Sequence, residues 1–159
     1  RLFMEERGAW HALIADPDFR DIRFVVEVHE NTLCSSVSGA LRLLDGLPAE
    51  RVGVIYDPGN SMQEGNEPLP VCLSLLGDLL VSMHVKDKRL GRDADHWCSL
   101  GTESTPLGEG DMNWPPIMRL LRERDYTGPI CLENFTGFDR GPERIAADLV
   151  WLRQVLQAA

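Results

Sequence analysis

The stretch "LLVSMHVKDKRL", residues 79–90, decides the fold because a run of apolar residues leads directly into a group of ionisable ones. The apolar part is typical of a buried β-strand. His84, Lys86 and Asp87 stand at its end. A buried strand that finishes in three ionisable side chains raises the question of what chemistry they serve.

Three further apolar runs are rich in β-branched residues and bounded by turn-forming residues, and they also predict strands. They cover residues 22–28, 51–56 and 128–134. Like residues 79–85, these runs are continuously apolar and do not alternate between apolar and polar residues. This pattern favours parallel strands that helices cover.

Segments with helical spacing follow the predicted strands. We expect helices at 36–47, 67–80, 113–124 and 141–157. Asn113 is a candidate cap for the third helix, whose prolines suit a first helical turn. In the fourth helix, the apolar residues that fall on one face are Ile145, Leu149, Leu152 and Leu156.

A further segment before the first strand, "ERGAWHALIADPDFRD", is typical of a helix that Asp16 and Pro17 close. The chain opens at this helix without an initiating methionine, as a fragment of something longer would. Strands and helices then alternate, which requires right-handed crossovers and a parallel sheet. With 159 residues, the sequence predicts a single α/β domain over residues 1–159.

The composition excludes several classes of protein. No window approaches the roughly 18 apolar residues of a membrane span, and the N-terminus lacks the apolar core of a secretory signal, so we expect a soluble, cytoplasmic protein without a membrane partner. The four cysteines form no CxxC pair, which favours buried thiols in a reducing compartment. A net charge of −9 repels phosphate backbones, so nucleic acid is not an expected partner.

Four candidate metal ligands stand at or near the ends of the four predicted strands: Glu27, Asp57, His84 and Glu133. Their first two intervals, 30 and 27 residues, match the roughly 31 residues of one unit of a (β/α)8 barrel. The third interval, 49 residues, matches one unit with a long loop, which we place at 87–110. Carboxylates and an imidazole at one edge of a sheet suit Mn²⁺, Mg²⁺, Co²⁺ or Zn²⁺, and the absence of thiolates argues against a closed structural zinc site.

Each of these residues also has a simpler interpretation. Glu27 fits an outward strand residue paired with an arginine, and Asp57 fits the first residue of an Asx or proline turn. His84 fits a hydrogen-bonded core histidine, and Glu133 fits a cap of the following loop. The coincidence of four such placements favours the metal site.

The segments around the four residues resemble the second half of the xylose-isomerase-like barrels, the sugar phosphate isomerase/epimerase superfamily. The resemblance covers about residues 22–135 and rests on "FVVEVHENTL", "VGVIYDPGN", "SMHVKD" and "PLGEGDMNWPPIMRLLRERDYTGPICLE". It implies the second half, about strands five to eight, of a TIM (β/α)8 barrel. It also implies that one divalent cation is bound by Glu27, Asp57, His84 and Glu133.

The same resemblance implies a function. Members of this superfamily isomerise or epimerise sugars or sugar phosphates by proton transfer next to a carbonyl, through a metal-stabilised enediolate. By similarity to the ketose 3-epimerases, Glu27 and Glu133 would each be both metal ligand and acid/base. Two alternatives remain open: an inosose-type dehydratase, and a non-catalytic half-barrel that binds metal or serves assembly.

Substrate-binding candidates follow from their positions beside the ligands. His29 shares the predicted strand face of Glu27, Asn60 lies three residues after Asp57, and Lys86 lies two after His84. Lys86 would approach either substrate oxygens or a neighbouring carboxylate. The alternatives are a structural histidine for His29, a turn-stabilising asparagine for Asn60 and a solvated lysine at a strand end for Lys86.

Three features near these candidates have mainly structural interpretations. Asp87 is expected to orient the loop that follows it. Gly108 and Gly110 allow a tight turn around Glu109. Residues 91–105 form either a lid carrying Trp97 or a variable surface loop.

Four strands are half of what a closed barrel needs. An open parallel sheet exposes its edges and apolar side chains, which favours pairing with another chain. We therefore expect a homo-oligomer or pairing with a missing N-terminal half.

Overall fold

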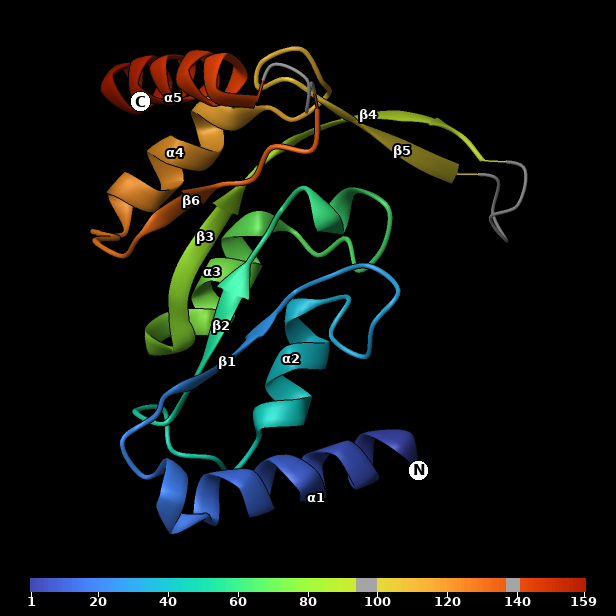
Figure 1. The fold of residues 1–159 in the computed structure, drawn as a ribbon, viewed down its shortest axis with the longest axis vertical. Helices are drawn as coiled ribbons and strands as arrows, with labels where there is room; N and C mark the ends of the chain where they lie inside the picture. The colour runs from blue at the N-terminus through green and yellow to red at the C-terminus, as the bar shows by residue number, and fades with distance from the viewer. Residues whose placement is uncertain (94–99, 137–140) are drawn as a thin grey trace. The chain divides into compact units, whose positions relative to one another are not determined.

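The computed structural model describes residues 1–93, 100–136 and 141–159 (Figure 1). These residues form two compact units, Arg1–Met83 and His84–Ala159. The border between the units falls inside strand β3 (Leu80–Val85). The single domain expected from the sequence stays a prediction.

The first unit is built on parallel strands, with β2 between β1 and β3. Glu27 at the end of β1 pairs in register with Ile55, and Tyr56 at the end of β2 pairs with Met83. The strands therefore finish at the same edge, as their apolar sequences predict. The bounds of the first two strands are β1 (Phe24–Glu27) and β2 (Val52–Tyr56).

Helices and strands together supply the core of the first unit. Helix α2 packs on β2 and on helices α1 and α3 (Figure 1). The side chain of Ser36 caps α2 by accepting a hydrogen bond from the Gly39 backbone at 3.0 Å. The helices of this unit, with their short 3-10 turns, are α1 (Leu2–Ala15), η1 (Pro17–Phe19), α2 (Val37–Leu44), η2 (Asn60–Met62), α3 (Leu69–Leu76) and η3 (Gly77–Leu79).

Helix α3 is shorter than the expected 67–80. It ends at Leu76 because Gly77 adopts a positive φ of 46°, a conformation that glycine tolerates best. A 3-10 turn then leads into β3. The first helix ends as expected at Asp16, whose side chain accepts a hydrogen bond from the Asp18 backbone at 2.9 Å.

The second unit contains the last residues of β3, with β6 as the neighbouring strand. The backbone N–H of Glu133, directly after β6, donates to the carbonyl of Val85 at 2.9 Å. The other elements of this unit are β4 (Asp87–Arg92), β5 (Leu100–Thr105), α4 (Trp114–Glu123), β6 (Ile130–Leu132) and α5 (Gly141–Ala158).

The expected long loop at 87–110 is wrong in part, because β4 and β5 pair there as an antiparallel hairpin. Asp87 lies opposite Thr105, and Arg92 lies opposite Leu100. The side chains of these strands are mostly polar, so no apolar pattern marks them. Backbone pairing holds the hairpin, and residue composition gives little signal of such pairing.

Helix α4 begins at Trp114 with two prolines in its first turn, as expected. Asn113 is its N-cap residue by position, but its side chain makes no capping hydrogen bond. A cap side chain normally accepts from the second or third helical N–H. Those positions are Pro115 and Pro116, which have no N–H to donate. The expected cap is therefore wrong.

Helix α5 packs on α4 (Figure 1). Of the apolar face noted in its sequence, only Leu152 is buried, whereas Ile145 is 45% exposed. Asp148 is buried beside Leu152, with 1% of its surface exposed. A charged residue therefore faces inward from this helix. Within the described residues, no helix has the length and apolar character needed to cross a membrane.

Candidate metal centre

Each of the four predicted ligands stands at or next to the end of a strand of the four-stranded sheet. Glu27 is the last residue of β1, Asp57 follows β2, and Glu133 follows β6, while His84 is the next-to-last residue of β3. Asp57 is buried and the other three are half-buried, and each offers one ligand atom. Two of them belong to each compact unit.

In the first unit, Asp57 is fixed by the backbone that follows it. Its Oδ1 accepts hydrogen bonds from the N–H groups of Gly59 at 2.8 Å and Asn60 at 3.2 Å. This is the Asx turn that the sequence "DPGN" allows. The turn holds a buried carboxylate in one orientation.

Asn60 connects Asp57 to Glu27. Its side-chain Nδ2 donates to Glu27 Oε1 at 3.2 Å and to the carbonyl of Val28 at 3.1 Å. Only 1% of Asn60 is exposed. The structure therefore places this predicted substrate-binding residue against a predicted ligand, and its binding of substrate stays a prediction.

In the second unit, Glu133 lies between two nitrogen groups. Its Oε1 is 2.8 Å from His84 Nδ1, and its Oε2 accepts a hydrogen bond from Lys86 Nζ at 2.9 Å. The Lys86 ammonium also lies 5.3 Å from the centre of the Phe135 ring, within the range of a cation–π contact. Of the two partners expected for Lys86, the structure shows the carboxylate.

His29 lies in the loop after β1 and is exposed. Because β1 ends at Glu27, the prediction that His29 shares its strand face is wrong. His29 Nδ1 lies 2.8 Å from the carbonyl oxygen of Glu30. His29 and Glu27 both line a groove of about 400 Å³ in the first unit, together with Thr32 and Leu33.

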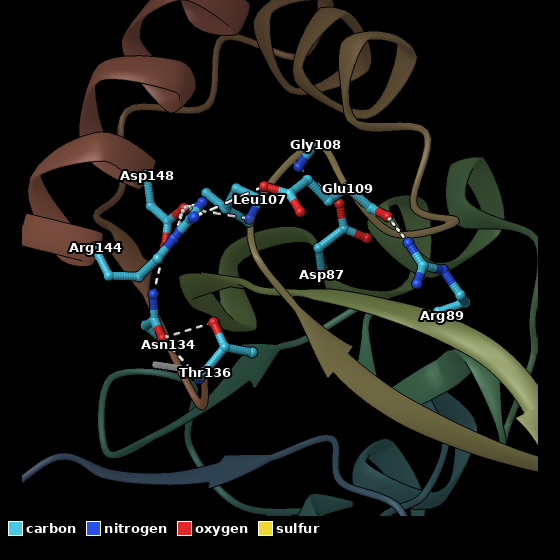
Figure 2. Close-up of polar contacts among 9 residues, drawn as sticks. All are labelled: Asp87, Arg89, Leu107, Gly108, Glu109, Asn134, Thr136, Arg144 and Asp148. Atoms are coloured by element: carbon cyan, nitrogen blue, oxygen red, sulfur yellow. Dashed lines mark hydrogen bonds and ion pairs between the residues drawn. The ribbon is translucent and has the colours of Figure 1, made fainter. Parts of the chain in front are cut away.

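Asp87 holds the turn that follows the hairpin (Figure 2). Its Oδ2 accepts from the Gly108 N–H at 2.9 Å, and its Oδ1 accepts from the N–H groups of Lys88 and Met112 at 3.0 and 3.1 Å. The loop-orienting role expected of Asp87 is confirmed. Gly108 has a φ of 83°, so the tight turn expected around Glu109 is confirmed as well.

Two further polar residues, Asn134 and Asp148, were not among the predicted site residues. Asn134 directly follows Glu133, and its Nδ2 donates a hydrogen bond to Asp148 Oδ2 (Figure 2). The sequence signal that could have identified Asp148 was its charge within the apolar pattern of the predicted helix. Trp97, the expected lid residue, lies outside the described residues.

Buried thiols lie in the first unit but are poorly suited to bind metal. Burial raises the pKa of both the Cys34 and the Cys72 thiols, so both stay protonated at neutral pH. Burial also raises the pKa of the Tyr56 phenol, which directly precedes Asp57. Metals bind the thiolate form of cysteine, so the oxygen and imidazole donors are the available ligands.

Comparisons with known proteins agree on the fold. The family model for the xylose isomerase-like TIM barrel matches residues 7–155. A xylose isomerase-like TIM barrel protein from Mycobacterium smegmatis, solved in complex with magnesium, is 23% identical, with a TM-score of 0.63 over 91% of this chain and 53% of that one. No curated protein matches the sequence.

Two other solved structures have similar folds. A D-tagatose 3-epimerase-like protein is 18% identical, with a TM-score of 0.73 over 98% of this chain and 54% of that chain. The probable 3-DHS dehydratase AsbF from Bacillus anthracis is 21% identical, with a TM-score of 0.61 over 85% of this chain and 51% of that one. The chain therefore spans about half the length of these structures.

The expected α/β fold, built from (β/α) units of a TIM barrel, is confirmed by the parallel strands and by these structural neighbours. The family match covers nearly the whole chain. The chain belongs to the xylose isomerase-like TIM barrel family.

Proposed function

We propose that this chain is the metal-binding half of a sugar isomerase or epimerase that depends on one divalent cation. The observation that carries the proposal is the contact of Glu133 with both His84 and Lys86. Carboxylate and imidazole groups are ligands of divalent cations, and a carboxylate can also act as a general acid or base. Membership of the family adds sugar chemistry as the expected class.

We propose further that Glu27, Asp57, His84 and Glu133 share the cation. The parallel register supports this, because Tyr56 pairs with Met83 and the next residues along the two strands are Asp57 and His84. Three carboxylates and one imidazole suit Mn²⁺, Mg²⁺, Co²⁺ or Zn²⁺. When bound, the cation would polarise the substrate carbonyl and lower the barrier to removal of the adjacent proton.

The two glutamates would move that proton. For epimerisation, one carboxylate removes the proton from the carbon next to the carbonyl, and the other returns a proton to the opposite face. Lys86 donates a hydrogen bond to Glu133 Oε2 and would hold that carboxylate in place. Asn60 donates to Glu27 Oε1 and would hold that carboxylate in place, while its role toward substrate, like that of His29 and Lys86, is part of the proposal.

The substrate we propose is a small-molecule sugar. The groove of about 400 Å³ beside Glu27 is comparable in size to known small-molecule sites. The coverage of about half of each solved relative supports pairing with a second copy or with a further part of the barrel. Sedimentation velocity tests pairing with a second copy, because a stably folded monomer would contradict it.

Proton exchange tests the proposed function. The chain, loaded with Mn²⁺, is incubated in D₂O with a panel of ketoses, and NMR follows deuterium entering the carbon next to the carbonyl. We expect the wild-type chain to form the deuterated epimer and Glu133→Gln, which lacks one of the two acid/base groups but keeps its size, to form none. The control is Glu103→Gln, an exposed hairpin residue, which should form the epimer as wild type does. Epimer formation by Glu133→Gln would contradict the assignment.

Dehydration is the second candidate function, and the structural likeness to a dehydratase favours it. A dehydratase would remove the same proton and then eliminate water from the substrate. Mass spectrometry separates the two reactions, because a dehydrated product is lighter by one water and an epimer has unchanged mass. A chain that binds metal and exchanges no proton would support the non-catalytic module.

A further inference from the structure

A chain of hydrogen-bonded polar groups runs through the second unit from the end of β6 to helix α5 (Figure 2). Asp148 on α5 is 1% exposed. Its Oδ2 accepts from Asn134 Nδ2, and its Oδ1 accepts from Arg144 Nη2 at 2.7 Å and from the Leu107 N–H at 3.3 Å. Since a buried charge is stable only when it is paired and hydrogen-bonded, this arrangement fixes Asp148.

Asn134 is held at both ends of its amide. The donating Nδ2 contacts Asp148, and the accepting Oδ1 receives the N–H of Thr136 at 2.8 Å. An amide with both ends occupied has one orientation. Because Asn134 is bonded to Glu133, its orientation limits where the Glu133 backbone can lie.

Two carboxylates, those of Asp87 and Asp148, hold the turn at 107–112. Asp148 accepts the Leu107 N–H, while Asp87 accepts the N–H groups of Gly108 and Met112. Asp87 is three residues from His84, and Asp148 reaches Glu133 through Asn134. The turn therefore joins the strand end that carries His84 to the strand end that carries Glu133.

The geometry points to a positioning role: Asp148, acting through Asn134, sets the position of Glu133 relative to His84 and thereby tunes metal binding. This inference rests on the proposed function. Partners that orient metal ligands through hydrogen bonds commonly change metal affinity by about 10–100-fold when they are altered. Asp148 touches neither predicted ligand, so its effect would pass through Asn134.

Mn²⁺ titration followed by electron paramagnetic resonance tests this role. The variant is Asp148→Asn, which keeps the size of the side chain and removes its charge. We expect Mn²⁺ affinity to fall at least about tenfold, and the spectrum of the bound ion to change because Glu133 is displaced. Circular dichroism checks that the variant is folded, and Asn134→Ala in the half-buried loop carries the same expectation if Asp148→Asn does not fold.

The matched control is Glu109→Gln, which removes one carboxylate from the same network at an exposed position. Glu109 Oε1 lies 3.7 Å from Arg144 Nη1, and its side chain is 60% exposed. Its Mn²⁺ affinity and spectrum should equal those of wild type.

The variant Glu133→Gln distinguishes failure of the positioning role from failure of the proposed metal centre. If wild-type chain binds Mn²⁺, Glu133→Gln weakens binding, and a folded Asp148→Asn or Asn134→Ala binds as wild type does, the positioning role is overturned and the proposed function stands. If wild-type chain binds no Mn²⁺, or Glu133→Gln binds it unchanged, the proposed metal centre is overturned and the positioning role with it.

Discussion

The two compact units hold their predicted ligands in different ways. In the first unit, Asp57 and Glu27 receive hydrogen bonds from neutral N–H groups, those of the Asx turn and of the Asn60 amide. In the second unit, Glu133 contacts an imidazole and an ammonium group. Local backbone holds Asp57, and a side chain 33 residues away in sequence contacts Glu27, whereas Glu133 contacts side chains 47 residues or more away.

This difference predicts where the protein is most easily damaged. Neutral donors within one turn keep their positions when a neighbour is replaced. A charge that is half-buried loses its compensation when its partner is removed. Substitutions in the second unit should therefore cost more stability than those in the first.

Lys86→Met should have the largest effect. Lys86 is 4% exposed, and removing its ammonium leaves Glu133 without its charged hydrogen bond. We expect the free energy of unfolding to fall by about 3 kcal/mol, at the low end for a broken buried pair because the Glu133 side chain is 21% exposed. Urea denaturation measures this loss. Arg153→Met, at an exposed position on α5, is the control, and an equal loss in both variants would contradict the distinction.

Gly108→Ala should come next. Its φ of 83° disfavours a side chain, and a Cβ would collide with the Trp151 ring. We expect a loss of about 2 kcal/mol from backbone strain and crowding. Gly8→Ala in helix α1 of the first unit meets no neighbouring atom and should gain up to about 1 kcal/mol. Thermal unfolding of the two variants measures both changes. Unchanged stability of Gly108→Ala would contradict the expected strain and show that the turn tolerates rearrangement.

Asn60→Ala should weaken Mn²⁺ binding while the Asx turn of Asp57 persists, because that turn uses only backbone N–H groups. We expect a decrease in affinity of about tenfold, since Glu27 loses the donor that orients it. Isothermal titration calorimetry measures the change. Asn66→Ala, an exposed asparagine of the same loop region, should bind as wild type. Unchanged binding by Asn60→Ala would remove Asn60 from the account.

Alkaline pH should have the smallest effect, and it should act on the first unit. Burial raises the pKa of the Cys34 and Cys72 thiols above their ordinary value of 9.0. As the pH rises, the unfolded chain therefore loses these protons before the folded chain does. The contribution of the two thiols to the free energy of unfolding is fully present below pH 9 and is lost as the pH rises above 9. Urea denaturation from pH 7 to pH 10 should show a smaller decline in Cys34→Ala than in the exposed-site control Cys131→Ala. Equal declines would contradict burial as the cause.

The sequence predicted those features that depend on neighbouring residues. The apolar runs predicted the strands, and the residues that follow them in "YDPGN" and "LEN" stand at strand ends as expected. Runs of apolar residues identify these strands because a buried strand needs apolar side chains to pack in the core. The Asx turn at Asp57 is equally local.

Features held by polar contacts between distant residues were not predictable in this way. The contact from Asp148 to Leu107 spans 41 residues, and the β4–β5 hairpin is held by backbone pairing between polar strands. The cap expected at Asn113 is wrong because two prolines remove its donors. Such outcomes depend on three-dimensional partners, which hydrophobic periodicity does not report.

The most direct test of the central claim is the Mn²⁺ stoichiometry of the purified chain and of the variants Asp57→Asn and His84→Gln. Asp57→Asn alters a predicted ligand of the first unit, and His84→Gln alters one of the second unit. The account predicts one Mn²⁺ per wild-type chain and its loss in either variant, because both residues would bind the same ion. No Mn²⁺ in the wild-type chain, or one bound ion that survives either substitution, would contradict a shared metal centre.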